Sequence, residues 1–245
     1  MKRAVCFSTG NMYQVTNNIH KMIDDSLKLD VDGIELLFSN AETLLKFRFK
    51  KDEISRLRKL KHNTIHLPFY KTERKDRIYF FNTPYCRKII AKLCKIASQI
   101  NAVNLNLHAH QLKNEKVLEG FKNFNFTFEN LMPYHGFTVK DYKAVLKKHP
   151  DFRFLLDTSH AILNNNLKEL VKNFKDKISF IHLSAAKYEE QKDHFLIHRF
   201  NHHSRKELDI IKRLKCPVII EAGREKGLKL KDFKKEISYV RRWLK

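Results

Sequence analysis

The stretch FRFLLDTSHAILNNNLKELVKNFKDKISFIHLS, residues 152–184, says most about the fold. It holds two short apolar runs, Phe152–Asp157 and Ile178–Leu183, with a longer amphipathic segment between them. Runs that are apolar almost throughout are typical of parallel strands that are buried on both faces. Since parallel neighbours need a long crossover, the stretch predicts a strand–helix–strand unit.

The same alternation recurs along the whole chain. Helical segments follow the strands, and the last helix shows the apolar stripe most clearly, from Leu230 to Leu244. Eight such units fit a (β/α)8 barrel, which typically needs ~250 residues. We therefore predict an α/β fold, a single TIM barrel with eight parallel strands that forms one domain over residues 1–245. An open doubly wound sheet is the alternative, but no GxGxxG motif follows the first strand to support it. The other six strand-length runs are Ala4–Ser8, Gly33–Phe38, Asn63–Leu67, Val103–His108, Phe124–Asn130 and Val218–Glu221.

Composition narrows the class of protein. The 245 residues are 42% apolar, which excludes wholesale disorder. No apolar run approaches the ~20 residues of a membrane span, and the apolar stretch after Lys2 and Arg3 is too short for a signal peptide. The four cysteines form no CxxC pair, so we expect reduced thiols in a cytoplasmic protein without a membrane partner.

The net charge is strongly positive, because 49 Lys and Arg residues face 27 Asp and Glu residues, which gives +22. Such a charge suits nucleic acid or another phosphate-bearing partner. Lys-rich solvated faces also occur without a partner of this kind, and charge alone does not choose between the two.

Histidines and carboxylates gather where the predicted strands end. Because the carboxyl ends of barrel strands surround one pocket, which holds the active site in this fold, we expect these side chains to converge. Neutral imidazole and carboxylate suit Zn, Mn or Fe, and a carboxylate can bridge two ions. For any single position the alternative is a structural role, such as a helix cap at Asp157 or His160. The residues are His66, His108, His110, Glu129, Asp157, His160, His182, Asp193, His194 and Glu221.

This set resembles the xylose isomerase-like TIM-barrel superfamily, and within it most closely the endonuclease IV family (AP endonuclease family 2). The most specific segments are LLDTSHA, residues 155–161, and the Glu-Asn pair of FTFEN, residues 126–130. His108 and the pair Asp193-His194 separate the pattern from the simpler sugar isomerases, which usually lack one or both of these extra ligands.

The resemblance implies a site for up to three zinc ions, with Mn or another divalent metal also possible. His66, His108 and Glu129 would hold one ion, and Glu129 would bridge to a second. Asp193 and His194 are adjacent, whereas the family separates them by one residue, and adjacent side chains on an extended loop should diverge. In the implied site, the second ion would be held by Glu129, Asp157, His182 and Glu221, and the third by His160, Asp193 and His194.

The implied activity is metal-dependent hydrolysis of the DNA phosphodiester 5′ to abasic sites, a DNA-repair reaction. Glu129 and Glu221 are the predicted catalytic residues, since they could position or deprotonate water as well as bind metal. The alternative is a sugar or sugar-phosphate isomerase or epimerase, in which the two glutamates move a proton between adjacent carbons. A nucleic-acid-binding barrel with a degenerate site is a third, non-enzymatic possibility.

Two loops are candidates for substrate contact. The loop LPFYKTERKDRIYFF, residues 67–81, mixes basic and aromatic side chains that suit phosphate contact and base stacking, although Tyr79–Phe81 could instead pack on the barrel. A second basic loop runs from His194 through His198, Arg199, His202, His203 and Arg205 to Lys206. The predicted substrate-binding residues are Phe69, Tyr70, Lys71, Arg74 and Arg199.

Overall fold

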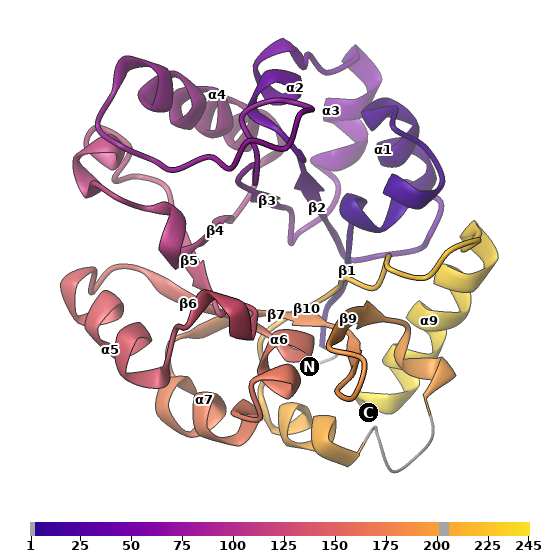
Figure 1. The fold of residues 1–245 in the computed structure, drawn as a ribbon. Coiled ribbons are helices and arrows are strands. Elements are labelled where there is room, and N and C mark those ends of the chain that lie inside the picture. The colour runs from indigo at the N-terminus through magenta and orange to yellow at the C-terminus, as the bar shows by residue number, and fades with distance from the viewer. Residues whose placement is uncertain (1–2, 201–205) are drawn as a thin grey trace.

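The computed structural model describes residues 3–200 and 206–245, and eight parallel strands form a closed barrel. The predicted TIM barrel is confirmed, with helices packed around the strands (Figure 1). Around the barrel the order is β1-β10-β7-β6-β5-β4-β3-β2, so neighbours in sequence are neighbours in space. The strands are β1 (Val5–Ser8), β2 (Gly33–Leu37), β3 (Thr64–His66), β4 (Asn104–His108), β5 (Phe126–Glu129), β6 (Arg153–Asp157), β7 (Ile178–Leu183) and β10 (Val218–Ile220).

Local capping residues and buried apolar faces account for the positions of the α-helices shown next. The longest, α4 (Pro84–Ile100), has proline in its first turn, and Thr83 Oγ1 accepts a hydrogen bond from the amide of Cys86 at 3.3 Å. In α9 (Leu230–Trp243), Phe233, Ile237 and Val240 are buried against the barrel. Burying such a side chain contributes about 1.5–3 kcal/mol, so packing rather than propensity holds these helices in place. The other α-helices are α1 (Ile19–Leu27), α2 (Ala41–Lys46), α3 (Lys51–Leu57), α5 (Val139–Lys148), α6 (Thr158–Leu163) and α7 (Leu167–Phe174).

In two crossovers the described residues differ from the α-helix that was expected there. Between β4 and β5 the chain forms only the 3-10 turns Ala109–Gln111 and Glu115–Leu118, because Gly120 and the polar residues there give no helical stripe. After β7 the described residues form the antiparallel hairpin of β8 (Ala185–Lys187) and β9 (Lys192–Phe195), then further 3-10 turns. The remaining 3-10 helices are Thr9–Gln14, Pro133–His135, Ile197–Arg199 and Glu207–Arg213.

Other expectations concern cysteines, membranes and the second basic loop. All four cysteines are free, and three of them are buried. Among the described residues no helix has both the length and the apolar character that a membrane span requires. His202, His203 and Arg205 lie outside the described residues.

Candidate metal centre

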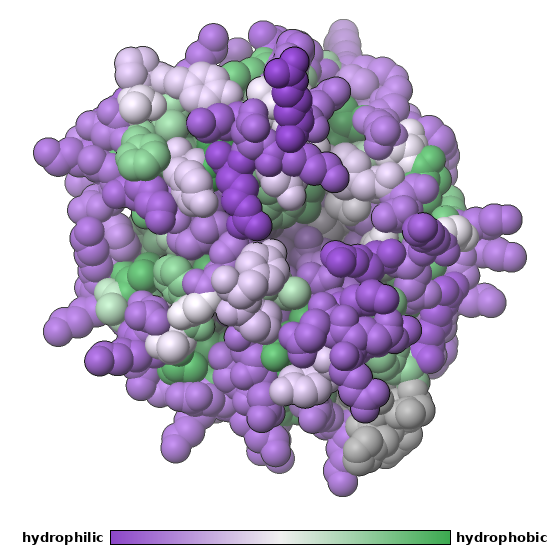
Figure 2. Space-filling view, in the orientation of Figure 1, coloured by the Kyte–Doolittle hydropathy of each residue, from purple (hydrophilic) through white to green (hydrophobic). Residues whose placement is uncertain are grey.

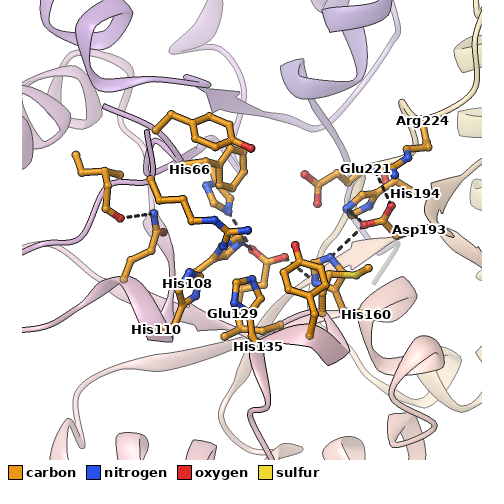
Figure 3. A pocket seen from close by; sticks show the side chains of 18 residues that line it. His66, His108, His110, Glu129, His135, His160, Asp193, His194, Glu221 and Arg224 are labelled. Atoms are coloured by element: carbon orange, nitrogen blue, oxygen red, sulfur yellow. Dashed lines mark hydrogen bonds and ion pairs between the residues drawn. The ribbon is translucent and has the colours of Figure 1, made fainter. Parts of the chain in front are cut away.

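The predicted ligands converge at the carboxyl ends of the strands. Figure 2 shows a depression near the centre of this face, bordered by hydrophilic side chains. The pocket has a volume of about 260 Å³. Figure 3 shows His66 and His108 on one side of it, Asp193 and His194 on the other, and Glu129 between them. Asp157 and His182 are completely buried beside them.

Strand register explains much of this convergence. His108 on β4 pairs with Glu129 on β5, and Asp157 on β6 pairs with His182 on β7. Because residues paired across parallel strands project to the same side of the sheet, each pair places a carboxylate beside an imidazole. Glu221 follows the last residue of β10 and completes the circle.

Glu129 is the centre of the cluster, and its two oxygens face different histidines. Oε2 lies 3.0 Å from Nε2 of His66 and 3.4 Å from Nε2 of His108. Oε1 lies 3.2 Å from Nδ1 of His182. Two ligand atoms that each lie ~2.1 Å from a tetrahedral zinc ion are about 3.4 Å apart, so these separations fit coordination. A carboxylate placed in this way is suited to bridge two ions.

The donor atoms fall into three overlapping groups of the kind that hold metal ions. The first two share Glu129, and the second and third share Asp157, so the groups form a chain of three through two carboxylates. The first contains His66, His108 and Glu129, the second Glu129, Asp157, His182 and Glu221, and the third Asp157, His160 and His194.

The imidazole rings are oriented by hydrogen bonds on their outer nitrogens. Nδ1 of His66 lies 2.7 Å from the carbonyl oxygen of Leu67, and Nδ1 of His160 lies 2.9 Å from that of Asn130. When these nitrogens donate to the carbonyls, Nε2 of each ring carries a free lone pair directed into the cluster. Metal-binding histidines in proteins are held in this way, because the outer bond fixes the tautomer and the ring orientation.

Among the described residues, only one of the two carboxylate oxygens of Asp157 is hydrogen-bonded. Its Oδ1 accepts hydrogen bonds from the amide of His160 at 2.6 Å and from the hydroxyl of Ser159 at 2.8 Å. Its Oδ2 is buried without a hydrogen bond among the described residues, 3.9 Å from Nδ1 of His182 and 4.0 Å from Nδ1 of His194. Burying an unsatisfied carboxylate oxygen is costly, and a cation next to Oδ2 would remove that cost. The residues present therefore fit a metal centre.

The expectation that Asp193 and His194 diverge is corrected by the structure. Oδ2 of Asp193 lies 3.5 Å from Nε2 of His194, and the same oxygen lies 3.7 Å from Nε2 of His160. Side chains alternate only along extended backbone, whereas His194 has φ of 58°, in the left-handed region. The turned backbone brings both side chains to the same side of the hairpin.

The pKa values show how strongly these groups interact. Burial lowers the pKa of His160, but the negative charge of Asp157 and a hydrogen bond with Asp193 outweigh it and raise that pKa to about 10. Burial raises the pKa of Asp157 above its ordinary value. For Glu129, burial is outweighed by the charges of His182 and His108, which hold its pKa well below the usual range. Without metal, protons on His66, His160 and His182, whose pKa values are raised, compensate the carboxylate charge, whereas burial lowers the pKa of His108.

Sequence reasoning missed one buried carboxylate, Glu35 on β2. It lies 3.1 Å from Nε2 of His182 and accepts hydrogen bonds from Asn106 and from the hydroxyl of Thr64. The signal was present, because a single acidic residue interrupts the apolar run Gly33–Phe38. Glu35 is completely buried and orients His182 from behind.

The predicted substrate-binding residues divide into two sets. Phe69 and Tyr70 line the pocket, and the ring of Phe69 lies 4.8 Å from that of His66. Lys71 and Arg74 are exposed and lie outside the pocket lining. In the same first loop, Phe80 is buried in the core.

Arg199, a predicted substrate-binding residue, does not line the pocket. Its guanidinium pairs with Glu225 and, at 2.9 Å, with Asp232, so acidic neighbours already neutralise its charge. The arginines that line the pocket are Arg77 and Arg224. The position of Arg224, 3.1 Å from Oδ1 of Asp193, depends on loop packing that no short motif reveals.

Comparison with known proteins bears on the fold of the chain. The sequence matches no protein-family model, and no curated protein is significantly similar to it. Its structural neighbours include endonuclease IV, D-psicose 3-epimerase and a putative sugar phosphate isomerase/epimerase. The chain therefore has the same fold as the family that its sequence motifs resemble.

Three solved structures illustrate the range of these neighbours. Endonuclease IV from Thermus thermophilus superposes with a TM-score of 0.64 at 14% identity, over 98% of both chains. D-psicose 3-epimerase from Clostridium cellulolyticum, with D-tagatose, gives 0.65 at 12% identity, over 98% of this chain and 99% of that one. The probable 3-DHS dehydratase from Bacillus anthracis gives 0.68 at 11%, over 97% and 98%. At these identities the likeness establishes the fold.

Proposed function

We propose that this protein is a divalent-metal-dependent hydrolase that resembles endonuclease IV and cleaves the phosphodiester bond 5′ to abasic sites in DNA. The observation that carries the proposal is the chain of three donor groups joined by Glu129 and Asp157. His108 extends this chain on one side, and His160 and His194 extend it on the other. Zinc is the ion that the resemblance favours, and imidazole and carboxylate donors also accept manganese.

Divalent ions held by these residues would activate water and stabilise the negative charge that develops on the phosphate. The chain's own groups divide the remaining work. Glu129 is almost fully buried and belongs to two of the donor groups, so it would help to hold the ions of both. The side chain of Glu221 is 13% exposed and lines the pocket, so it can orient an attacking water molecule. Burial raises the pKa of Glu221, but the charges of His182 and His194 outweigh it, and a pKa of about 2 keeps the carboxylate ionised.

Positive side chains at the rim would hold the DNA. Arg77 and Arg224 line the same pocket as the ligands, and guanidinium groups bind phosphate through charge-assisted hydrogen bonds. The net charge of +22 adds long-range attraction for a polyanion. Binding to DNA should therefore weaken steeply as the salt concentration rises.

The test is cleavage of a synthetic duplex that contains one tetrahydrofuran abasic-site analogue. We expect a single nick on the 5′ side of the analogue, which a chelator abolishes and added Zn²⁺ or Mn²⁺ restores. An undamaged duplex of the same sequence is the control. Metal-loaded protein that leaves the analogue duplex intact would contradict the proposal.

A sugar or sugar-phosphate isomerase or epimerase is the second candidate. The observation in its favour is that Glu129 Oε1 and Glu221 Oε2 lie 3.2 Å and 2.6 Å from the same nitrogen, Nδ1 of His182. Two carboxylates that meet at one point can exchange a proton with neighbouring carbons of a bound sugar. This candidate predicts turnover of a free ketose and no salt-dependent affinity for duplex DNA.

A further inference from the structure

An aromatic column leads from the metal ligands to the outer edge of the pocket. The ring centroid of His108 lies 5.6 Å from that of His110, and His110 stacks on His135 at 4.1 Å with an interplanar angle of 28°. The ring of His135 lies 4.4 Å from that of Tyr134. Figure 3 shows His108, His110 and His135 together at one side of the pocket. The column therefore connects a metal ligand with the surface of the protein.

The outer end of this column is open to solvent. Tyr134 is 69% exposed, more than any other exposed large hydrophobic residue in the described part of the chain. It lies in the 3-10 turn Pro133–His135, which ends at Gly136, and the φ of 67° there is easily adopted by glycine. A rigid, exposed ring next to a pocket costs little conformational entropy when a flat ligand stacks on it.

The guanidinium group of Arg77 lies next to the exposed ring of Tyr134. The Cζ atom of Arg77 lies 5.8 Å from the ring centroid of Tyr134, a cation–π contact between the loop after β3 and the loop after β5. Both residues line the pocket that contains the candidate ligands. The side chain of Arg77 is exposed, so its outer N–H groups can reach a ligand while it contacts the ring.

We propose that Tyr134 and Arg77 form a nucleotide subsite, in which Tyr134 stacks on a base that flanks the abasic site and Arg77 binds a neighbouring backbone phosphate. This inference rests on the proposed function and names the part of the DNA that this edge of the pocket recognises. An abasic position leaves the adjacent bases incompletely stacked, and an aromatic face replaces the lost partner. The guanidinium matches the phosphate that accompanies each base.

Binding can be measured without turnover on a duplex that is already nicked 5′ to a tetrahydrofuran analogue and carries 2-aminopurine next to it. The wild-type protein should quench the 2-aminopurine fluorescence, because stacking on an aromatic ring shortens the excited-state lifetime of 2-aminopurine. Tyr134→Ala should lose this quenching and bind about tenfold more weakly, and Tyr134→Phe should retain both properties. Tyr188→Ala is the matched control, since Tyr188 is also exposed and lies outside the pocket lining.

Arg77 has a separate readout. Arg77→Ala should reduce the slope of log affinity against log salt by about one, the loss of one phosphate contact. Arg153→Ala, at the start of β6 and therefore at the opposite end of the barrel, removes the same charge and should leave the slope nearly unchanged. Thermal unfolding of each variant confirms that the fold is retained.

The outcomes separate this inference from the proposed function. If the wild-type protein nicks the abasic duplex but Tyr134→Ala binds and quenches as the wild type does, the subsite is refuted while the function stands. If the wild-type protein neither binds nor cleaves abasic DNA, the proposed function fails and the subsite fails with it. Loss of quenching in Tyr134→Ala, with normal behaviour of Tyr188→Ala, supports the subsite.

Discussion

The carboxylate of Glu35 lies 3.1 Å from Nε2 of His182, while Nδ1 of the same ring lies 2.6 Å from Oε2 of Glu221. One nitrogen of the imidazole ring is thus fixed by a buried carboxylate, and the other points to the candidate ligands. Asn106 and Thr64 donate to Glu35 and hold it in place. This arrangement orients His182, a candidate metal ligand, without the help of an ion.

Glu35→Gln is expected to weaken zinc binding by about 10- to 100-fold, the effect typical of losing the partner that orients a ligating histidine. The measurement is competition between the protein and a chromophoric chelator. Glu42→Gln is the control, because Glu42 is an exposed residue that pairs with Lys46 on α2. An unchanged affinity in a normally folded Glu35→Gln protein would show that Glu35 does not act on the metal.

Glu129→Ala is expected to abolish catalysis and to reduce the bound metal, because Glu129 belongs to two of the three donor groups. Activity on the abasic duplex and metal content by elemental analysis are measured together. Glu190→Ala removes an exposed carboxylate on the hairpin and serves as the control. Full activity in Glu129→Ala would refute the bridging role.

Metal stoichiometry tests the extended cluster. We expect three ions per chain, and one fewer in His108→Ala, because the group of His66 and Glu129 then retains only two donors. Elemental analysis after dialysis gives the count, with the untreated wild type measured in parallel. One ion per chain, with no change in His108→Ala, would remove the main argument for the nuclease.

The pKa of about 10 for His160 predicts that zinc displaces protons at pH 8. Metal binds the neutral ring, so His160 alone should contribute about one released proton, and affinity should rise with pH. In the metal-free protein, protonated His160 stabilises the folded state. Because the pKa of His160 in the folded protein lies above the ordinary value of 6.5, its contribution to the free energy of unfolding is complete below pH 6.5 and is lost as the pH rises toward 10.

Calorimetry in two buffers of different ionisation enthalpy counts the protons released at pH 8. His160→Gln should release fewer protons than the wild type at the same pH. Zinc binding without proton release would mean that the ligating histidines are already neutral in the metal-free protein.

The left-handed backbone of His194 predicts a difference between two variants. His194→Gly and His194→Ala both remove the imidazole, and both should lose the metal of the third group. Glycine adopts φ of 58° without the steric cost of Cβ, so the metal-free glycine variant should be more stable by roughly 1 kcal/mol. Chemical denaturation of chelator-treated proteins measures this difference, and equal stability would show that the strain is absent.

Much of the barrel follows from local sequence. Strands such as Phe152–Asp157 are short and apolar almost throughout, and this pattern depends on burial from both faces. The crossover between β4 and β5, which lacks an α-helix, was not predicted, because the alternation of strands and helices was extended to a segment without a helical stripe. Between residues 109 and 125 the chain forms only the 3-10 turns Ala109–Gln111 and Glu115–Leu118.

The candidate site was also predictable from the sequence only in part. The donor types and their places at strand ends can be read from the sequence, because strand order and parallel direction bring those ends to one face. Three relations required the folded chain: Asp157 joins two donor groups, Glu35 orients His182, and Arg224 rather than Arg199 lines the pocket. These relations depend on strand register and loop backbone angles, which are set by contacts between segments distant in the chain.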